Sequence, residues 1–288
     1  MPRRLLLLAL PLLLCPLVGC GDDSAPVEAA GTHAVATESF TFVDEDRVTP
    51  AFGSSPEQPT RTVVTDVWYP SEADGPFPLI VFNHGQQGEP GQYAPSFERW
   101  ASAGYVVAAP RHPLSVRGGP GAQFVDDMMG EIGDVPFTIT SIEEELGSLV
   151  DDGNVAVAGH SSGAVVADAI AFDTCCLDDR VDAVVTESLI NLPFDGGSAT
   201  GQGTPVLFVH GTADSNPIAQ SQTAFAEASA PKFLLTVEGG NHSEMYRDGP
   251  EAGPIADAVL RFLDFALKGD DDAEPALAGL AGMQADPG

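Results

Sequence analysis

The sequence places one serine between glycines, in the pentapeptide Gly159 to Gly163, Gly-His-Ser-Ser-Gly. The apolar run Val155 to Ala158 precedes this pentapeptide, and the helix-like stretch Ala164 to Phe172 follows it. A chain that passes from a buried strand into a helix over so few residues must turn sharply, so the positions two before and two after the serine need to be nearly free of side chain. The pattern predicts that Ser161 lies on a strand-to-helix turn at the end of a sheet, with its hydroxyl exposed.

An acid and a histidine follow this serine at the ends of later strand-like runs. The run Thr204 to His210 opens into a loop that contains Asp214, and the run Lys232 to Val237 ends in a glycine-rich loop that contains His242. The carboxyl ends of neighbouring parallel strands meet at one edge of a sheet, so the three side chains are expected to lie together. A serine hydroxyl becomes a good nucleophile when a histidine takes its proton and an acid orients that histidine. The sequence therefore predicts Ser161 as nucleophile, His242 as base and Asp214 as acid.

Simpler explanations exist for two of these residues. Ser161 could be an ordinary helix N-cap, although a cap needs neither flanking glycines nor downstream partners. Asp214 could cap a helix that begins near Asn216, and Glu187, at the end of the strand-like run Val181 to Thr186, could supply the acid instead. The order of serine, acid and histidine along the chain favours Asp214 but leaves Glu187 as the alternative.

With these residues, the chain resembles the α/β-hydrolase superfamily, and within it the dienelactone hydrolases and the platelet-activating-factor acetylhydrolase-like esterases. The matching segments are Val67 to Pro70, Pro78 to Gly85, Gly104 to Pro110 and the three segments around Ser161, Asp214 and His242. Bacterial polyester-degrading cutinases share this arrangement. Their pentapeptide has tryptophan or tyrosine second and methionine fourth, which this chain lacks, so the polyester interpretation is disfavoured.

The resemblance implies an α/β-hydrolase fold, with a mostly parallel eight-stranded sheet and helices on both faces, over residues 39–268. It also implies a serine esterase that cleaves carboxylic esters, short-chain ones by default, through an acyl-enzyme, with no metal or organic cofactor. The oxyanion hole is expected from the backbone N–H groups of Ser162 and Gln86, or of Gln87 if the turn is shifted by one residue. A lipase or cutinase-like polyester hydrolase is the alternative, and a non-catalytic surface lipoprotein that binds through the same fold is another. A monomer is expected.

The order of elements agrees with this fold. Eight strand-like runs, from Ser39 to Val43 through Phe233 to Val237, alternate with helix-like stretches such as Ile142 to Leu149, which favours a doubly covered parallel sheet. The insert Arg111 to Asp134 and the loop Asn191 to Gly203 are expected to frame the substrate pocket.

The N-terminus resembles a bacterial lipoprotein signal. Basic residues at the start precede the apolar run Leu5 to Val18, which is short for a membrane span, and Gly19 and Cys20 follow it. The resemblance implies that residues 1–19 are a signal peptide, that Cys20 carries lipid, and that residues 20–38 form a flexible tether. The protein would then be exported and anchored to the cell envelope, on its periplasmic or outer side, with the lipid on Cys20 as its only membrane contact. A plain secretory signal cut near Ala29 is the alternative.

Composition constrains partners and the remaining cysteines. The net charge of −30 repels nucleic acid, which is therefore not expected as a partner. The adjacent Cys175 and Cys176 could form a disulfide after export or could be buried thiols, and the sequence does not decide between these. The acidic clusters lack the spacing of a known calcium loop. The tail, residues 269–288, is rich in Asp, Ala, Gly and Pro and is predicted to be disordered.

Overall fold

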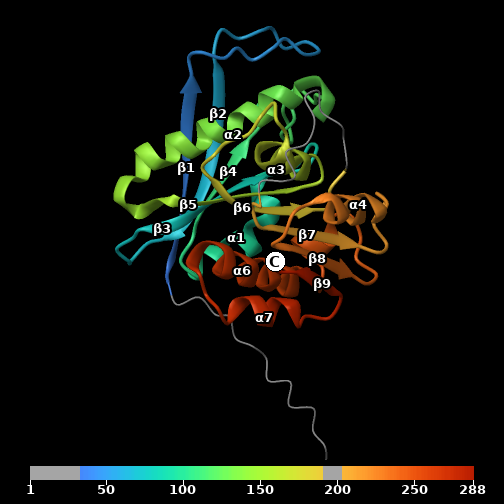
Figure 1. The fold of residues 1–288 in the computed structure, drawn as a ribbon. Helices are drawn as coiled ribbons and strands as arrows, with labels where there is room; N and C mark the ends of the chain where they lie inside the picture. Colours follow the sequence, from blue (N-terminus) through green and yellow to red (C-terminus); the bar gives the residue numbers. More distant parts are fainter. Residues whose placement is uncertain (1–32, 191–202) are drawn as a thin grey trace, which may run out of the picture.

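Nine strands form one sheet in the computed structural model, which describes residues 33–190 and 203–288 (Figure 1). The order across the sheet is β1-β2-β4-β3-β5-β6-β7-β8-β9. The strands are β1 (Val35–Asp44), β2 (Arg61–Pro70), β3 (Phe77–Asn83), β4 (Val106–Arg111), β5 (Val150–His160), β6 (Val181–Glu187), β7 (Val206–Gly211), β8 (Lys232–Val237) and β9 (Met283–Asp286). Strands β4, β3, β5, β6, β7 and β8 pair in parallel, whereas β1, β2 and β9 pair antiparallel at the two sides. The predicted mostly parallel α/β sheet is confirmed.

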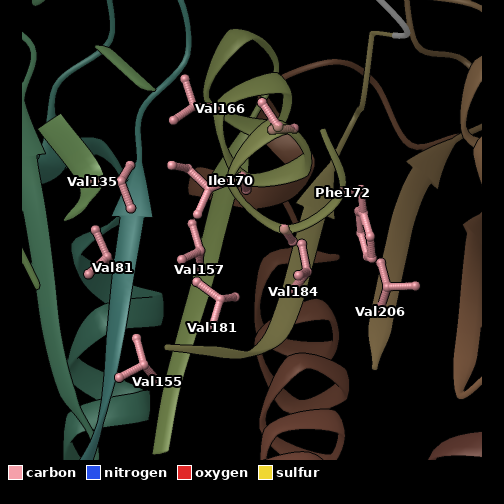
Figure 2. Packing of buried hydrophobic residues seen from close by; sticks show 14 of the residues in the cluster. Val81, Val135, Val155, Val157, Val166, Ile170, Phe172, Val181, Val184 and Val206 are labelled. Atoms are coloured by element: carbon pink, nitrogen blue, oxygen red, sulfur yellow. The ribbon is translucent and has the colours of Figure 1, made fainter. Parts of the chain in front are cut away.

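Helices cover both faces of the sheet (Figure 1). They are α1 (Ala94–Ser102), α2 (Phe124–Leu146), α3 (Ser162–Phe172), α4 (Ala219–Glu227), α5 (Glu244–Arg247), α6 (Ala252–Lys268) and α7 (Ala273–Ala278), with 3-10 turns η1 (Pro90–Tyr93) and η2 (Gly147–Leu149). Successive side chains of a strand point to opposite faces, so β5 contributes to two cores. Val155 and Val157 pack in the cluster under α2 and α3 (Figure 2). Ala156 and Ala158 face the cluster of α1 and α6.

The C-terminal tail is ordered, so the prediction of disorder was wrong. Residues 273–278 form α7, where Leu277 is completely buried, and β9 pairs antiparallel with β8 from Leu235 to Lys232. An unpaired edge strand exposes backbone N–H and C=O groups, and β9 satisfies those of β8. The tail therefore adds the ninth strand to the eight predicted. The composition suggested disorder because few apolar residues lie among the Ala, Gly, Asp and Pro of the tail, yet Ala273 and Leu277 are buried and Leu280 and Met283 pack against the core.

The N-terminal boundary also shifts. Strand β1 begins at Val35, so residues 35–38 belong to the sheet and not to the predicted tether. The predicted signal, Cys20 and residues 20–32 lie outside the described residues, as does the segment 191–202, which is nearly all of the loop expected to frame the pocket. None of the described helices is long and apolar enough to cross a membrane.

Helix α2 starts much earlier than the predicted helix Ile142 to Leu149. It takes in the end of the insert that was expected to be a pocket loop, and it contains Gly130, Gly133 and Pro136, all poor helix formers. Position 130 has no room for a side chain. A Cβ atom at that position would lie 2.2 Å from Asp127 Oδ1 and 2.8 Å from Arg61 Nη1, so the glycine admits a buried arginine beside the helix.

Candidate active site

Ser161 lies on the turn between β5 and α3, as the glycine spacing predicts. Its φ is +57°, a value that residues with a side chain rarely adopt. The flanking glycines are required by contact: a Cβ atom at Gly159 would lie 2.1 Å from the carbonyl oxygen of Gly163, and one at Gly163 would lie 2.0 Å from that of Asn83. The Ser161 N–H donates to the carbonyl of Glu187 at 2.8 Å. The turn is thus held by β3 and β6, the two neighbours of β5.

The structure brings Ser161, His242 and Asp214 together from three separate loops. His242 Nε2 lies 3.0 Å from Ser161 Oγ, and His242 Nδ1 lies 2.9 and 3.0 Å from the two oxygens of Asp214. A carboxylate only accepts, so Nδ1 carries the proton and Nε2 accepts from the serine hydroxyl. This is the arrangement in which a histidine can remove the proton of a serine.

Asp214 is held ionised by its hydrogen bonds. Burial alone would raise the pKa of this carboxyl. The bonds from His242, from the Ser188 hydroxyl and from the Asn216 N–H, which donates at 2.7 Å, outweigh burial and lower the pKa of Asp214 to about 2. Ser188 itself has a φ of +54°. Ser188 was not predicted from the sequence, because a serine that follows a strand has no distinctive pattern.

Glu187, the alternative acid, is buried at the end of β6. Its Oε2 has no hydrogen-bond partner in the described part of the chain, and burial raises the pKa of Glu187 to about 8. A carboxyl that keeps its proton near neutral pH is a poor partner for an imidazolium. The geometry places Asp214 against His242, so Glu187 is a neutral neighbour of the nucleophile.

Gln86 lies in a turn next to Ser161. The Gly88 N–H donates to the Gly85 carbonyl at 2.7 Å, and Gln87 has a φ of +54°, which defines a tight turn of Gly85 to Gly88. A Cβ atom at Gly85 would lie 3.2 Å from Ser161 Cβ, so the turn abuts the nucleophile. The Gln86 side chain donates to the Ala122 carbonyl at 2.6 Å and accepts from the N–H of the first α2 residue, an anchor that the sequence analysis did not foresee.

Ser162 is the first residue of α3. Backbone N–H groups in the first turn of a helix have no partner within the helix and carry partial positive charge, so they favour a negative oxygen. Ser162 and Gln86 thus both lie next to Ser161, and their N–H groups stay the predicted oxyanion donors.

His160 has a contact that the sequence analysis missed. Its Nε2 donates to the backbone carbonyl of His242 at 2.6 Å, and its Nδ1 accepts from the Tyr93 hydroxyl at 2.8 Å. The ring is buried, and its centroid lies 4.9 Å from that of His242. Burial, assisted by the nearby His242, lowers the pKa of His160 to about 3, so the ring is neutral. The residue before the nucleophile thus holds the loop of His242 in place.

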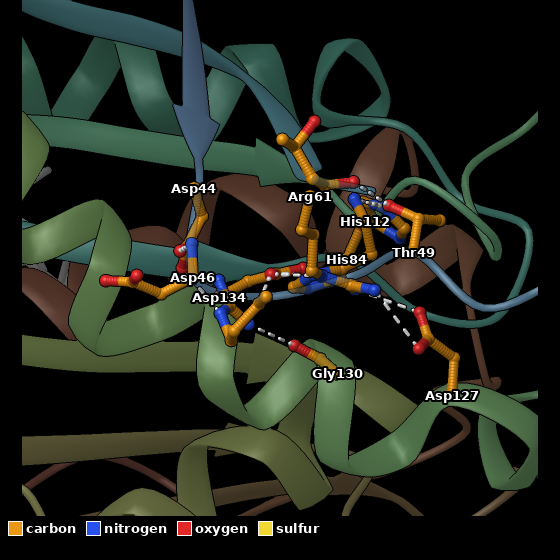
Figure 3. A network of polar contacts seen from close by, with 11 residues as sticks. Asp44, Asp46, Thr49, Arg61, His84, His112, Asp127, Gly130 and Asp134 are labelled. Atoms are coloured by element: carbon orange, nitrogen blue, oxygen red, sulfur yellow. Dashed lines mark hydrogen bonds and ion pairs between the residues drawn. The ribbon is translucent and has the colours of Figure 1, made fainter. Parts of the chain in front are cut away.

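A buried polar network supports the turn that contains Gln86 (Figure 3). His84 Nδ1 donates to the Gly85 carbonyl at 2.9 Å, and the His112 N–H reaches His84 Nε2 at 3.4 Å. His112 Nδ1 lies 3.0 Å from Asp134 Oδ2, and Arg61 Nε donates to Asp134 Oδ1 at 2.6 Å.

Arg61 also donates to both oxygens of Asp127, at 2.9 and 3.1 Å, so one buried guanidinium bridges two carboxylates of α2 (Figure 3). Burial would raise the pKa of Asp134, but the bonds from His112 and Arg61 lower it. The network couples α2 to the loop after β3.

Within residues 33–190 and 203–288, no group of three or more His, Cys, Asp or Glu side chains is placed to hold a metal ion. Cys175 and Cys176, just beyond the end of α3, form a disulfide between adjacent residues, which decides between the two states that the sequence left open.

Known proteins resemble the chain in sequence and in fold. A family model described as Chlorophyllase matches residues 35–224, a range that holds Ser161 and Asp214 and ends before His242. Among solved structures, the ferulic acid esterase from Streptomyces cinnamoneus is similar, with a TM-score of 0.68 and 20% sequence identity over 91% of this chain and 98% of that chain. At this identity the likeness shows the fold, and it confirms the α/β-hydrolase architecture. No curated protein matches the chain in sequence.

Proposed function

The chain belongs to the chlorophyllase family, and from the arrangement at Ser161 we propose that it is a carboxylic ester hydrolase with a serine nucleophile. The observation that carries this proposal is the pair of contacts at His242: Nε2 lies 3.0 Å from Ser161 Oγ, and Nδ1 faces both oxygens of Asp214. The family match and the fold of the esterase neighbour support ester hydrolysis as the reaction class.

The proposed reaction has two halves. In the first, His242 takes the Ser161 proton as the serine oxygen attacks the ester carbonyl carbon, and the N–H groups of Gln86 and Ser162 stabilise the oxyanion. The intermediate collapses by breaking the bond to the alcohol, which receives the proton from His242. In the second half, water attacks the acyl carbon while His242 takes one of its protons, the bond between that carbon and Ser161 Oγ breaks, Ser161 regains its proton from His242, and the acid leaves. Asp214 fixes the imidazole tautomer and offsets its positive charge.

The first test is hydrolysis of 4-nitrophenyl esters of graded chain length by the full chain. Short acyl chains are the proposed preference. Ser161→Ala removes the nucleophile and is expected to lower kcat by at least about 10³-fold. The matched control is Ser71→Ala, which removes an exposed hydroxyl at the end of β2. Equal hydrolysis by the folded Ser161→Ala variant and the wild type would overturn the proposal.

We also propose that the protein is exported and anchored through lipid on Cys20. The lipoprotein-like N-terminus and the disulfide between Cys175 and Cys176 support an oxidising compartment. Metabolic labelling with palmitate tests this. The wild type is expected to take up label and sediment with membranes, and Cys20→Ser is expected to do neither. Label that persists in Cys20→Ser would contradict the assignment.

A further inference from the structure

Arg247 occupies a fixed position beside the loop that carries His242. It is the last residue of α5, which begins two residues after His242. Its guanidinium lies over the ring of Tyr93, 5.3 Å from the centroid, and its Nη2 donates to the Tyr93 hydroxyl at 3.3 Å. Tyr93 is buried and hydrogen-bonds to His160. A guanidinium that stacks on an aromatic face and bonds to a hydroxyl has lost much of its freedom before any ligand arrives.

The guanidinium of Arg247 has no anionic partner among the described side chains. Apart from Arg261, every other described lysine and arginine has a carboxylate oxygen within 4.0 Å. The Nε of Arg247 is buried and has no acceptor in the described structure, which is a costly state for an N–H group. In a chain with a net charge of −30, carboxylates are abundant, so a guanidinium that has none among the described side chains is unusual.

This cation borders a cavity of about 470 Å³, whose size suits a small organic group. The lining residues are Gly91, Gln92, Pro95, Ser243, Arg247 and Asp248. Ser243 is adjacent to His242, and Gly91 and Gln92 belong to η1, which follows the turn that contains Gln86. The cavity therefore lies between two segments that build the candidate active site. Asp248 is exposed and does not pair with Arg247.

We propose that Arg247 binds a carboxylate of the substrate, so that the preferred substrates are esters that also carry an acidic group; this rests on the proposed esterase function. A planar guanidinium matches the shape of a carboxylate and can bind it through two parallel hydrogen bonds. The strongly acidic protein repels anions elsewhere, so a local cation is needed to bring an acidic ester to the nucleophile. The carboxylate of Asp248 acts against this attraction.

The test compares matched esters that differ by one carboxylate. On the acyl side these are the 4-nitrophenyl half-ester of glutaric acid and 4-nitrophenyl valerate; on the alcohol side they are 3-acetoxybenzoate and phenyl acetate. The ratio of kcat/KM for the acidic ester to that for the neutral ester is expected to fall about tenfold in Arg247→Gln for at least one pair. Arg247→Lys is expected to retain part of the ratio, and Asp248→Asn to raise it. Arg261→Gln removes the other unpaired arginine, on α6, and is the matched control.

A binding measurement separates this inference from the esterase proposal. Ligand-observed NMR is run on the full chain with Ser161→Ala, with benzoate and benzyl alcohol as probes. Benzoate binding that is lost on adding Arg247→Gln and retained on adding Arg261→Gln supports the carboxylate site, whether or not the wild type hydrolyses any ester. The inference would be overturned if benzoate bound equally well to the Arg247→Gln and Arg261→Gln variants. It would also be overturned if Arg247→Gln lowered kcat/KM by the same factor for acidic and neutral esters, because Arg247 would then only pack against Tyr93.

Discussion

The protonated carboxyl of Glu187 makes folding stability depend on pH, and Glu187→Gln should remove that dependence. Glu187 is buried beside the nucleophile, its Oε2 has no partner in the described structure, and burial raises the pKa of this carboxyl from 4.5 to about 8. Glutamine has the shape of the protonated carboxyl and no charge. The Glu187 carbonyl that accepts the Ser161 N–H belongs to the backbone and is retained in the variant.

The direction in which stability changes with pH follows from the number of protons that the folded and unfolded states bind. Between the unfolded pKa near 4.5 and the folded pKa of about 8, the folded state keeps a proton on Glu187 that the unfolded chain has released. Stability from this group is therefore full below pH 4.5, declines as pH rises, and levels off above pH 8. One pKa unit corresponds to about 1.4 kcal/mol, so this single residue is expected to cost the wild type about 3 kcal/mol of unfolding free energy between about pH 5 and pH 8.

Urea unfolding at several pH values between these limits measures the effect. The free energy of unfolding of Glu187→Gln minus that of the wild type is expected to grow with pH by about 3 kcal/mol. This difference cancels the contribution of the other buried acids to the pH dependence, because they titrate in both proteins. Glu57→Gln, at an exposed position, is the control and should give a flat difference. A flat difference for Glu187→Gln as well would refute the reasoning, since it would mean that Glu187 ionises in the fold as easily as in the unfolded chain.

Three further perturbations test the site and the fold. Asp214→Asn leaves His242 without its orienting carboxylate and is expected to lower kcat by about 10³ to 10⁴-fold with a small change in KM, measured on 4-nitrophenyl esters; a small loss would assign the acid elsewhere. Arg61→Met leaves the buried Asp127 without its cation and removes one of the partners of Asp134, so it is expected to lower the free energy of unfolding by about 3 to 5 kcal/mol in urea, whereas an unchanged midpoint would contradict the network. Deletion of residues 269–288 exposes the edge of β8, so a lower melting temperature and aggregation are expected in calorimetry and light scattering; unaltered melting would show that the tail is dispensable.

The parts of the site that sequence could predict are those in which a local rule dictates the residue. Gly159 and Gly163 are required by contacts of about 2 Å, so the turn at Ser161 could be recognised from five residues. Asp214 and His242 follow strands, and parallel strands end at a common edge, so their proximity to Ser161 could be predicted as well.

The features that the sequence analysis missed depend on partners far along the chain. Helix α2 contains Gly130 because Arg61, some seventy positions earlier, occupies the space beside it, and Gly133 likewise adjoins Arg47; no local pattern reveals these neighbours. The tail joins the sheet because β8 has a free edge, which is a property of the assembled sheet. The raised pKa of Glu187 depends on its burial, and the groups that surround a buried carboxyl cannot be read from the sequence.

His160 must be neutral for the site to work. Its Nε2 has to donate to the His242 carbonyl while its Nδ1 accepts from Tyr93, and only the neutral ring offers one donor and one acceptor. A proton on Nδ1 would remove the acceptor for Tyr93 and place a positive charge 4.9 Å, ring to ring, from the base that must itself become positive when it takes the serine proton. Burial prevents this by keeping the pKa of His160 near 3, and it likewise keeps Glu187 protonated near neutral pH. The two groups next to the nucleophile are therefore uncharged, which leaves Asp214 as the carboxylate that stabilises the imidazolium of His242.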